Sequence, residues 1–385
     1  MNSKKKICVF TSSRADYGIL KSLMLEIEKK KDAELQILVS GAHLDSTQGN
    51  TYQEIEKDGF SIQEKVEMNI LGSDRKDIAV AMGICLAGVA SALNRLQPDI
   101  LVVLGDRYEL LPACSAALVM KIPIAHISGG DVTEGAIDNQ VRHAVTKMAA
   151  LHFPGEETSA RRVHRLGEDT KTIFCYGELG LDRLSNVRIS KAEISKSLNI
   201  PLERDWIICT YHPETLSDSR LDIERVKNLL ATLSEVAPEF HTIVTAANSD
   251  HGGKEINQVI ENLCRENPRR SFFSSVGDEN FVGLLKHSQL MIGNSSSGII
   301  EAASFRMPVI NVGSRQMGRL MPENVIASDG SINDLKQALR RALSNQFRES
   351  IACMQNPYGS GDVAVKIADV LLSFEPTLYK GEFLT

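Results

Sequence analysis

The sequence predicts an α/β protein made of two Rossmann-like domains, each a parallel sheet with helices on both faces, with a cleft between them. Short runs rich in β-branched residues alternate with amphipathic helical stretches in both halves of the chain. The 385 residues exceed what one ordinary core accommodates. A polar, charged segment, 182–199, followed by Pro201, separates the halves. We therefore expect domains at 1–180 and 181–361, with a C-terminal helix and tail at 362–385.

The elements of the first half follow from this alternation. Buried parallel strands read as short apolar runs, whereas amphipathic helices repeat their apolar residues about every 3.6 positions. The expected strands are Ile7–Thr11, Leu35–Ser40, Ile100–Leu104, Ile122–Ile127 and Thr172–Cys175. The expected helices are Tyr17–Lys30, Lys76–Leu96, Leu110–Met120, Asp138–Ala150 and Glu156–Leu166.

The same alternation restarts after Pro201. The expected strands are Trp206–Tyr211, His241–Thr245, Ser271–Phe273, Gln289–Ile292 and Pro308–Val312, with helices between them. A last helix, Asp362–Phe374, follows a Pro-Tyr-Gly-Ser-Gly hinge and could return to pack on the first domain.

Composition excludes several classes of function. The 43% apolar and 24% charged residues are typical of a globular protein, and a net charge of −6 argues against nucleic-acid binding or a polybasic membrane role. No apolar run reaches the roughly 18 residues of a membrane span, and no signal-like segment opens the chain, so we expect a cytoplasmic protein. The seven cysteines are scattered, and neither they nor the histidines show metal-ligand spacing. We therefore assign no metal.

Candidate site residues follow strand ends, because ligands of open α/β sheets bind beyond the carboxyl ends of the strands. The first turn, Thr11–Gly18, lacks the GxGxxG pattern of dinucleotide sites but places Arg14 where a phosphate could bind. The alternative is a surface arginine capped by Asp16.

Two further turns of the first half are rich in carboxylates. The apolar run Leu101–Leu104 ends in Gly105-Asp106-Arg107, and charge at such a position favours Asp106 for acid–base work over a structural pair with Arg107. The next turn, Ser128-Gly129-Gly130, leads into Asp131, Glu134 and Asp138. Neighbouring carboxylates raise one another's pKa, which lets an acid and a base coexist. The alternative for Asp138 is a simple helix N-cap.

The second half offers anion-binding groups. His212 follows a strand and could bind or protonate a leaving phosphate, or be structural. The run Leu290–Ile292 precedes Ser295–Ser297 and a helix start, a geometry that points backbone N–H groups at an anion, although any capped helix shows the same pattern. Glu301 could accept hydrogen bonds from a ribose. Arg315 follows the last strand and adds a second positive anchor.

Six motifs in this order resemble the hydrolysing UDP-N-acetylglucosamine 2-epimerases of bacterial sialic acid synthesis and the epimerase half of the bifunctional animal enzyme. They are SRADYG, GDRYE, IDNQVRH, YHPET, GNSSSGIIEA and GSRQ. The resemblance implies a glycosyltransferase-B-like fold, a homodimer, and conversion of UDP-N-acetylglucosamine and water to N-acetylmannosamine and UDP. It implies no redox cofactor.

The resemblance also assigns site residues. Those expected around UDP are Arg14, His212, Asn248, Ser295, Ser296, Glu301 and Arg315, with Val276 near the base. His43, Arg107, Glu134 and Arg142 complete the expected binding residues. Asp106 and Asp138 fall among the catalytic acids, and His212 is included with them. Many relatives carry glutamate where this chain has Ser128, so we expect Asp131, or less readily Glu134, to replace it.

The expected chemistry begins with departure of UDP, which makes the sugar's C2 hydrogen acidic; one carboxylate removes that proton and another returns one to the opposite face. We expect Asp138 and Asp131 to divide these transfers while Asp106 tunes or shares one of them. Four alternatives stay open. They are the same reaction on UDP-N,N'-diacetylbacillosamine, a non-hydrolysing epimerase, a glycosyltransferase of the same fold and a nucleotide-sugar sensor. The sequence does not specify the sugar's substituents at C4 and C6.

Overall fold

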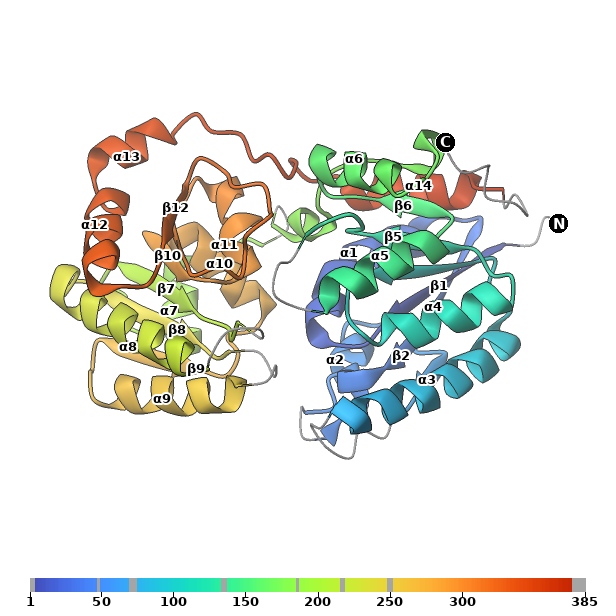
Figure 1. The fold of residues 1–385 in the computed structure, drawn as a ribbon, viewed down its shortest axis with the longest axis horizontal. Helices are drawn as coiled ribbons and strands as arrows, with labels where there is room; N and C mark the ends of the chain where they lie inside the picture. Colours follow the sequence, from blue (N-terminus) through green and yellow to red (C-terminus); the bar gives the residue numbers. More distant parts are fainter. Residues whose placement is uncertain are drawn as a thin grey trace. The chain divides into compact units, whose positions relative to one another are not determined.

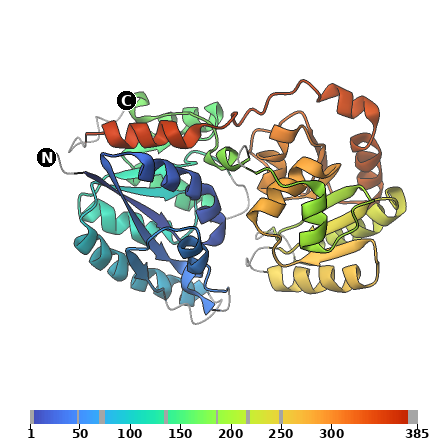
Figure 2. The same cartoon turned by 180° about the vertical axis from the view of Figure 1, so that it is seen from behind.

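The computed structural model describes residues 4–46, 49–68, 75–132, 137–184, 187–214, 219–247 and 252–375 (Figures 1 and 2). These residues form two compact units. Within the described ranges, unit 1 holds residues 4–131, 137–183 and 358–375, and unit 2 holds Val132 and 184–357. Each unit contains one six-stranded sheet in which every pairing is parallel, which confirms the predicted fold class.

The sheet of unit 1 has the strand order β3-β2-β1-β4-β5-β6. Its strands are β1 (Lys5–Thr11), β2 (Ala33–Ser40), β3 (Glu64–Val66), β4 (Ile100–Leu104), β5 (Ile124–Ile127) and β6 (Leu151–Phe153). Its helices are α1 (Arg14–Lys29), α2 (Tyr52–Lys57), α3 (Arg75–Leu96), α4 (Leu110–Val119), α5 (Asp138–Met148), α6 (Glu157–Arg165) and α14 (Val363–Ser373), with short 3₁₀ turns η1 (Gly41–Leu44), η3 (Thr170–Thr172) and η4 (Leu179–Arg183). The strand order reverses between β1 and β4, the place where such sheets bind ligands.

The C-terminal helix α14 packs on unit 1 beside α1 (Figure 2). Its buried residues Val363, Ile367 and Leu371 share one apolar cluster with Leu20 of α1. The Asp182 carboxylate accepts hydrogen bonds from the backbone N–H groups of Val363 (2.9 Å) and Ala364 (2.6 Å) at the start of α14. The chain therefore ends its described part in the unit where it began.

Helix α3 is apolar on two faces. Among the described residues, Lys76–Leu96 is the one helix whose length and composition would fit a membrane span. Its residues Ala81, Cys85 and Val89 are completely buried against the sheet. Its opposite face leaves Val80 55% and Ile84 37% exposed. The burial pattern is that of a core helix with an additional apolar surface.

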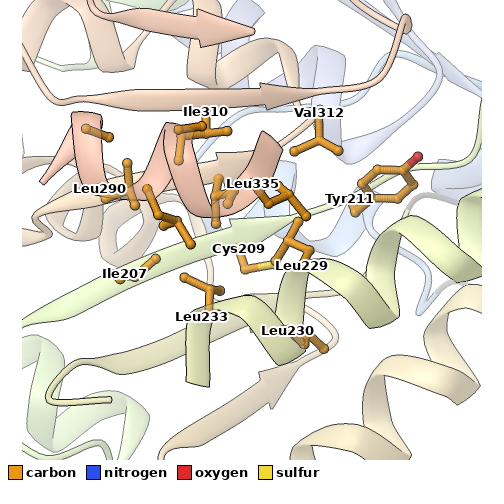
Figure 3. Close-up of a cluster of buried hydrophobic side chains, with 14 of the residues drawn as sticks. Ile207, Cys209, Tyr211, Leu229, Leu230, Leu233, Leu290, Ile310, Val312 and Leu335 are labelled. Atoms are coloured by element: carbon orange, nitrogen blue, oxygen red, sulfur yellow. The ribbon is translucent and has the colours of Figure 1, made fainter. Parts of the chain in front are cut away.

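The sheet of unit 2 has the order β12-β11-β10-β7-β8-β9. Its strands are β7 (Trp206–Thr210), β8 (His241–Thr245), β9 (Arg270–Phe273), β10 (Leu290–Gly293), β11 (Val309–Val312) and β12 (Val325–Ser328). Its helices are α7 (Lys191–Leu198), α8 (Ser219–Val236), α9 (Gly253–Arg265), α10 (Asp278–His287), α11 (Ser296–Ile299), α12 (Ile332–Ala342) and α13 (Asn345–Ser350), with a 3₁₀ turn η5 (Ala302–Phe305). Apolar side chains of β7, β10 and β11 pack against α8 and α12 (Figure 3). Here the order reverses between β7 and β10.

Two expected elements are wrong. Residues Thr172–Cys175 do not form a strand; η3 occupies 170–172, and Ile173 makes only an isolated bridge to His152. The sixth strand is instead β6, whose three residues are too few to show a periodic pattern. The helix expected to begin after Ser295–Ser297 is a single turn, α11, followed by η5. A Cβ at Gly298 would lie 3.0 Å from Val309 Cγ1, so this turn packs closely on β11.

Candidate functional site

The turn after β1 is built around a buried carboxylate. Asp16 accepts hydrogen bonds from the backbone N–H groups of Ser12 and Ser13, both at 3.0 Å, and from the hydroxyl of Thr11 at 2.5 Å. Ser13 caps α1. Arg14, the next residue, is exposed, and its nearest ion-pair partner is Glu54 at 3.9 Å rather than Asp16. The turn thus presents a guanidinium at the start of a helix, as a phosphate site requires.

His43 contacts this turn through Thr11. Its side chain is fully buried, with Nε2 3.0 Å from Thr11 Oγ1 and Nδ1 2.9 Å from Thr51 Oγ1. Because Thr11 gives its hydrogen to Asp16, we assign the imidazole hydrogen to Nε2. Burial lowers the pKa of His43, which agrees with a neutral ring. A direct role for His43 in ligand binding stays a prediction.

The turns after β4 and β5 meet at one buried arginine. Arg142 of α5, 2% exposed, donates from Nη2 to the Asp106 carboxylate and from Nη1 to the main-chain oxygen of Asp131 at 2.7 Å. Arg107 instead donates to Glu109 at 2.7 Å, so the alternative Asp106–Arg107 pair does not form. One cation therefore joins the Asp106 carboxylate to the main-chain oxygen of Asp131.

Asp138 lies on the same helix face as Arg142, four residues earlier. It is the first residue of α5, whose N-cap is Ile137, so it is not the simple N-cap of the alternative interpretation. Glu134 lies outside the described residues. Among the expected acids, the structure brings Asp106, Asp131 and Asp138 to the region organised by Arg142.

Side chains that sequence reasoning missed complete this region. His126 of β5 is fully buried; Nε2 lies 2.8 Å from the main-chain oxygen of Gly105, and Nδ1 lies 3.2 Å from Thr146 Oγ1. Burial lowers the pKa of His126 to about 4, so the ring is neutral. Glu178 accepts a hydrogen bond from Ser128 Oγ at 2.9 Å, which brings a carboxylate to the position where relatives are expected to carry glutamate. A contact between residues so far apart in sequence leaves no local signal.

In unit 2, one buried amide connects three turns. Asn294 is fully buried and accepts a hydrogen bond from His212 N at 2.6 Å while donating to His212 O at 2.8 Å. Its main-chain oxygen accepts from Gln316 Nε2 at 2.9 Å and Arg315 Nη1 at 3.3 Å. The turns after β7, β10 and β11, each with a predicted anion-binding residue, are thereby held in one arrangement.

Glu214 holds the Arg315 turn from the other side. Its carboxylate accepts hydrogen bonds from Ser314 N at 2.6 Å and Arg315 N at 3.1 Å, and it pairs with Arg225 at 3.1 Å. Burial opposes ionisation, but the hydrogen bonds from Ser314 and the charge of Arg225 lower the pKa of Glu214. The carboxylate therefore stays charged and keeps this loop fixed.

The imidazole of His212 is neutral in this structure. Burial and, to a smaller extent, the charge of Arg315 lower its pKa to about 3. A neutral ring can donate a hydrogen bond to a phosphate, whereas protonating it requires the pKa to rise when an anion binds.

The remaining expected residues have separate surroundings. Ser295 caps α11 through a 3.4 Å bond from Ser297 N, and Ser296 begins that turn. Glu301 is 6% exposed. Val276, 8% exposed, belongs to an apolar cluster with Met291. Asn248 lies outside the described residues. Within the described part of the chain, no three histidine, cysteine, aspartate or glutamate side chains group as a metal site would require.

Comparisons with known proteins point to one family, the 2-epimerases of nucleotide sugars. A family model described as UDP-N-acetylglucosamine 2-epimerase matches residues 25–372. A "GDP/UDP-N,N'-diacetylbacillosamine 2-epimerase (hydrolyzing)" of Campylobacter jejuni is 39% identical over 350 residues, 90% of each chain. A "UDP-N,N'-diacetylbacillosamine 2-epimerase (hydrolyzing)" of Legionella pneumophila is 34% identical over 368 residues, 95% of each chain. The crystal structure of UDP-GlcNAc 2-epimerase from Neisseria meningitidis bound to UDP-GlcNAc shares the fold, with a TM-score of 0.73, 18% identity, and coverage of 96% of this chain and 100% of that one.

Proposed function

This chain belongs to the UDP-N-acetylglucosamine 2-epimerase family, and from that premise we propose that it is a hydrolysing 2-epimerase of a UDP-linked 2-acetamido sugar. The reaction eliminates UDP, hydrates the resulting glycal and releases the free sugar with inverted configuration at C2. The observation that carries the proposal is the buried Arg142 of unit 1, which contacts the Asp106 carboxylate and the main-chain oxygen of Asp131 and lies one helical turn after Asp138. Binding an anionic nucleotide sugar gives no reason to gather carboxylates; moving protons does.

Departure of the diphosphate is assigned to the cationic and polar turns. Arg14, Arg315 and a neutral His212 would stabilise charge that grows on the leaving group, helped by the Ser295–Ser296 turn. The turns of His212 and Arg315 are already fixed by Asn294 and Glu214, and Asp16 fixes the backbone of the turn before Arg14, so little reorganisation of these turns is needed when the charge develops. Glu301, Val276 and Asn248 are proposed for the nucleoside.

Proton transfer is assigned to the carboxylates of unit 1. Loss of UDP makes the C2 hydrogen acidic enough for a carboxylate to remove. Asp138 takes this proton, and Asp131 delivers one to the opposite face at C2 as water adds at C1. Asp106, neutralised by Arg142, tunes this pair.

For the sugar, we propose UDP-N,N'-diacetylbacillosamine ahead of UDP-N-acetylglucosamine. The two relatives described above, 39% and 34% identical, carry that sugar in their names. UDP-N-acetylglucosamine is the second candidate, supported by the motif resemblance and the family description.

A product assay tests the function. The full-length protein is incubated with each UDP-sugar, and products are identified by NMR. We expect UDP and a free 2-epimerised sugar from both, with kcat/KM at least about tenfold higher for the diacetylated substrate, because a lost acetamido contact costs at least this much. A UDP-linked epimer would indicate the non-hydrolysing reaction. Turnover only with an added acceptor would indicate a glycosyltransferase.

We further propose a cytoplasmic homodimer. Helix α4 packs against α3 and exposes apolar side chains of its own, with Leu118 52% and Val119 82% exposed. An open groove of about 540 Å³, lined by Val66, Ile84 and Ala87 among others, borders the same helix. A second copy of the chain would cover this surface, as the resemblance implies.

A further inference from the structure

A serine hydroxyl lies between two buried carboxyl groups in unit 1. Ser159 Oγ of α6 lies 2.7 Å from Asp131 Oδ1 and 2.6 Å from Glu156 Oε1. The exposed fractions are 2% for Ser159 and 6% for each acid. Both distances are those of short O–H···O hydrogen bonds.

The number of hydrogens on these three side chains limits the hydrogen bonds that they can form. A serine hydroxyl carries one hydrogen and can donate one such bond; the second bond requires a hydrogen on the other partner. Two ionised carboxylates on one hydroxyl would also repel each other in a poorly solvated place. We infer that Asp131 and Glu156 share one proton through Ser159, that this proton resides on Asp131, and that Ser159 is a positioning residue that keeps Asp131 a carboxylic acid.

The placement on Asp131 follows from what else Glu156 touches. Glu156 is the N-cap of α6, where its side chain accepts from the backbone N–H groups of Thr158 and Ser159. These donors and the helix dipole favour a negative charge there. The chain of donors is therefore Asp131 O–H to Ser159 Oγ, and Ser159 O–H to Glu156.

Neighbouring charges are compatible with this assignment. Two guanidinium groups lie near Asp131: Arg142 donates to Asp106 and to the main-chain oxygen of Asp131, and Arg162 donates to the main-chain oxygen of Gly130. His143 of α5 is kept neutral by burial and by these arginines, which lower its pKa. Burial raises the pKa of the Cys175 thiol to about 12, as do the acids Glu157 and Glu156, so it remains protonated. Glu178 is a further carboxyl group beside this pair: it accepts a hydrogen bond from Ser128, and its Oε1 lies against Gly155, the residue before Glu156. Its charge also disfavours two ionised carboxylates on Ser159.

The consequence rests on the proposed function and assigns its acid. In the elimination, the C2 proton passes to Asp138 and the C1–O electron pair leaves with UDP. In the hydration, the glycal double bond takes the proton of Asp131 at C2, water bonds to C1, and the water's surplus proton goes to solvent. Asp138 then releases its proton and Asp131 regains one, helped by repulsion from Glu156.

Kinetics with three variants test the inference. Glu156→Gln removes the charge and keeps one acceptor oxygen, so one of the two amide N–H groups that now donate to Oε1 and Oε2 loses its acceptor. The basic limb of the kcat profile should move down by about one pH unit or more, as for coupled acids. Ser159→Ala should move it in the same direction and lower kcat at pH 7.5 by about 10²-fold, with KM nearly unchanged. Ser159→Thr restores the hydroxyl and should restore the profile. Ser22→Ala, another helical serine of unit 1, is the matched control.

Infrared spectroscopy gives a readout without turnover. A protonated carboxyl has a carbonyl stretching band that a carboxylate lacks. At pH 7.5 the intact protein should show such a band, which Asp131→Asn and Ser159→Ala remove and Ser22→Ala retains. If the wild-type enzyme turns over but Asp131→Asn removes no such band, or Ser159→Ala keeps the wild-type pH profile, the shared proton is excluded while the function stands. If the band behaves as expected without turnover, the proposed function fails instead.

Discussion

At the scale of single residues, buried charged side chains are held in specific ion pairs and hydrogen bonds. Arg142 is almost fully buried, and its partner Asp106 keeps 24% of its side chain exposed. Losing either member would leave a charge in a poorly solvated place, which costs several kcal/mol. The sequence predicted that Asp106 would matter but offered Arg107 as its structural partner, because a neighbour in sequence is visible and a contact from another helix is not.

Removing a carboxylate charge should stop turnover without disturbing the nucleotide. Asp106→Asn and Asp138→Asn should each lower kcat by at least about 10²-fold, because each removes a group that moves or tunes a proton. UDP affinity, measured by calorimetry, should stay within a few-fold of wild type. Wild-type turnover in both variants would remove these residues from the mechanism.

The buried histidines predict a pH-dependent stability. The pKa of His126 is about 4 in the folded protein, below its unfolded value of about 6.5, so the unfolded state binds a proton first as pH falls. With respect to this group, the free energy of unfolding should be at its maximum above pH 6.5 and should fall as the pH drops towards 4. His126→Asn removes the contribution of the neutral imidazole to stability, so the urea midpoint of the variant should lie below that of wild type at pH 7.5. The difference between the two midpoints should be smaller at pH 5. A constant gap would show that His126 does not titrate this way.

At the scale of elements, the turns after β7, β10 and β11 act together through Asn294. The local geometry demands glycine beside it: Gly293 has φ +135°, and a Cβ there would lie 1.9 Å from Thr210 O. Strand, turn and cap positions could be predicted here because each leaves a local pattern. The reciprocal bonds of Asn294 with His212 could not, since they join segments 82 residues apart.

Breaking the hydrogen bonds between Asn294 and His212 should weaken nucleotide binding more than it lowers the stability of the fold. Asn294→Ala loses both bonds to the His212 backbone, so the UDP dissociation constant should rise about 10- to 100-fold, the effect of one to two lost hydrogen bonds. Calorimetric titration with UDP measures this. Asn262→Ala on α9, whose side chain accepts only a 3.3 Å bond from Gln258 among the contacts described, should bind like wild type. Equal affinities for both variants would exclude the positioning role of Asn294.

At the scale of the whole molecule, each unit repeats one sheet order. The alternation of patterns predicted two parallel α/β halves but not the order of their strands. The strands β3, β6 and β12 were not predicted; β3 and β6 have three residues each, and neither β3 nor β12 is a continuous apolar run. The exposed apolar face of α3 and α4 was also hidden, since a sequence run does not tell which side of a helix the sheet covers. That face leads to a prediction about assembly.

Charge placed on this face should separate the proposed dimer. Val80→Glu combined with Leu118→Glu should halve the mass measured by light scattering after size-exclusion chromatography, because two carboxylates would be buried at the interface. Leu202→Glu, at a 45% exposed leucine of unit 2, should leave the mass unchanged. A wild-type protein that is already monomeric, or a double variant of unchanged mass, would contradict this assignment of the interface.

The most direct test of the central claim is to run the reaction in deuterated water with UDP-N,N'-diacetylbacillosamine and with UDP-N-acetylglucosamine. Elimination followed by hydration predicts that every molecule of free 2-epimerised sugar carries one deuterium at C2, because the original proton leaves before the new one arrives from Asp131. Free product that retains its original C2 hydrogen would contradict the account.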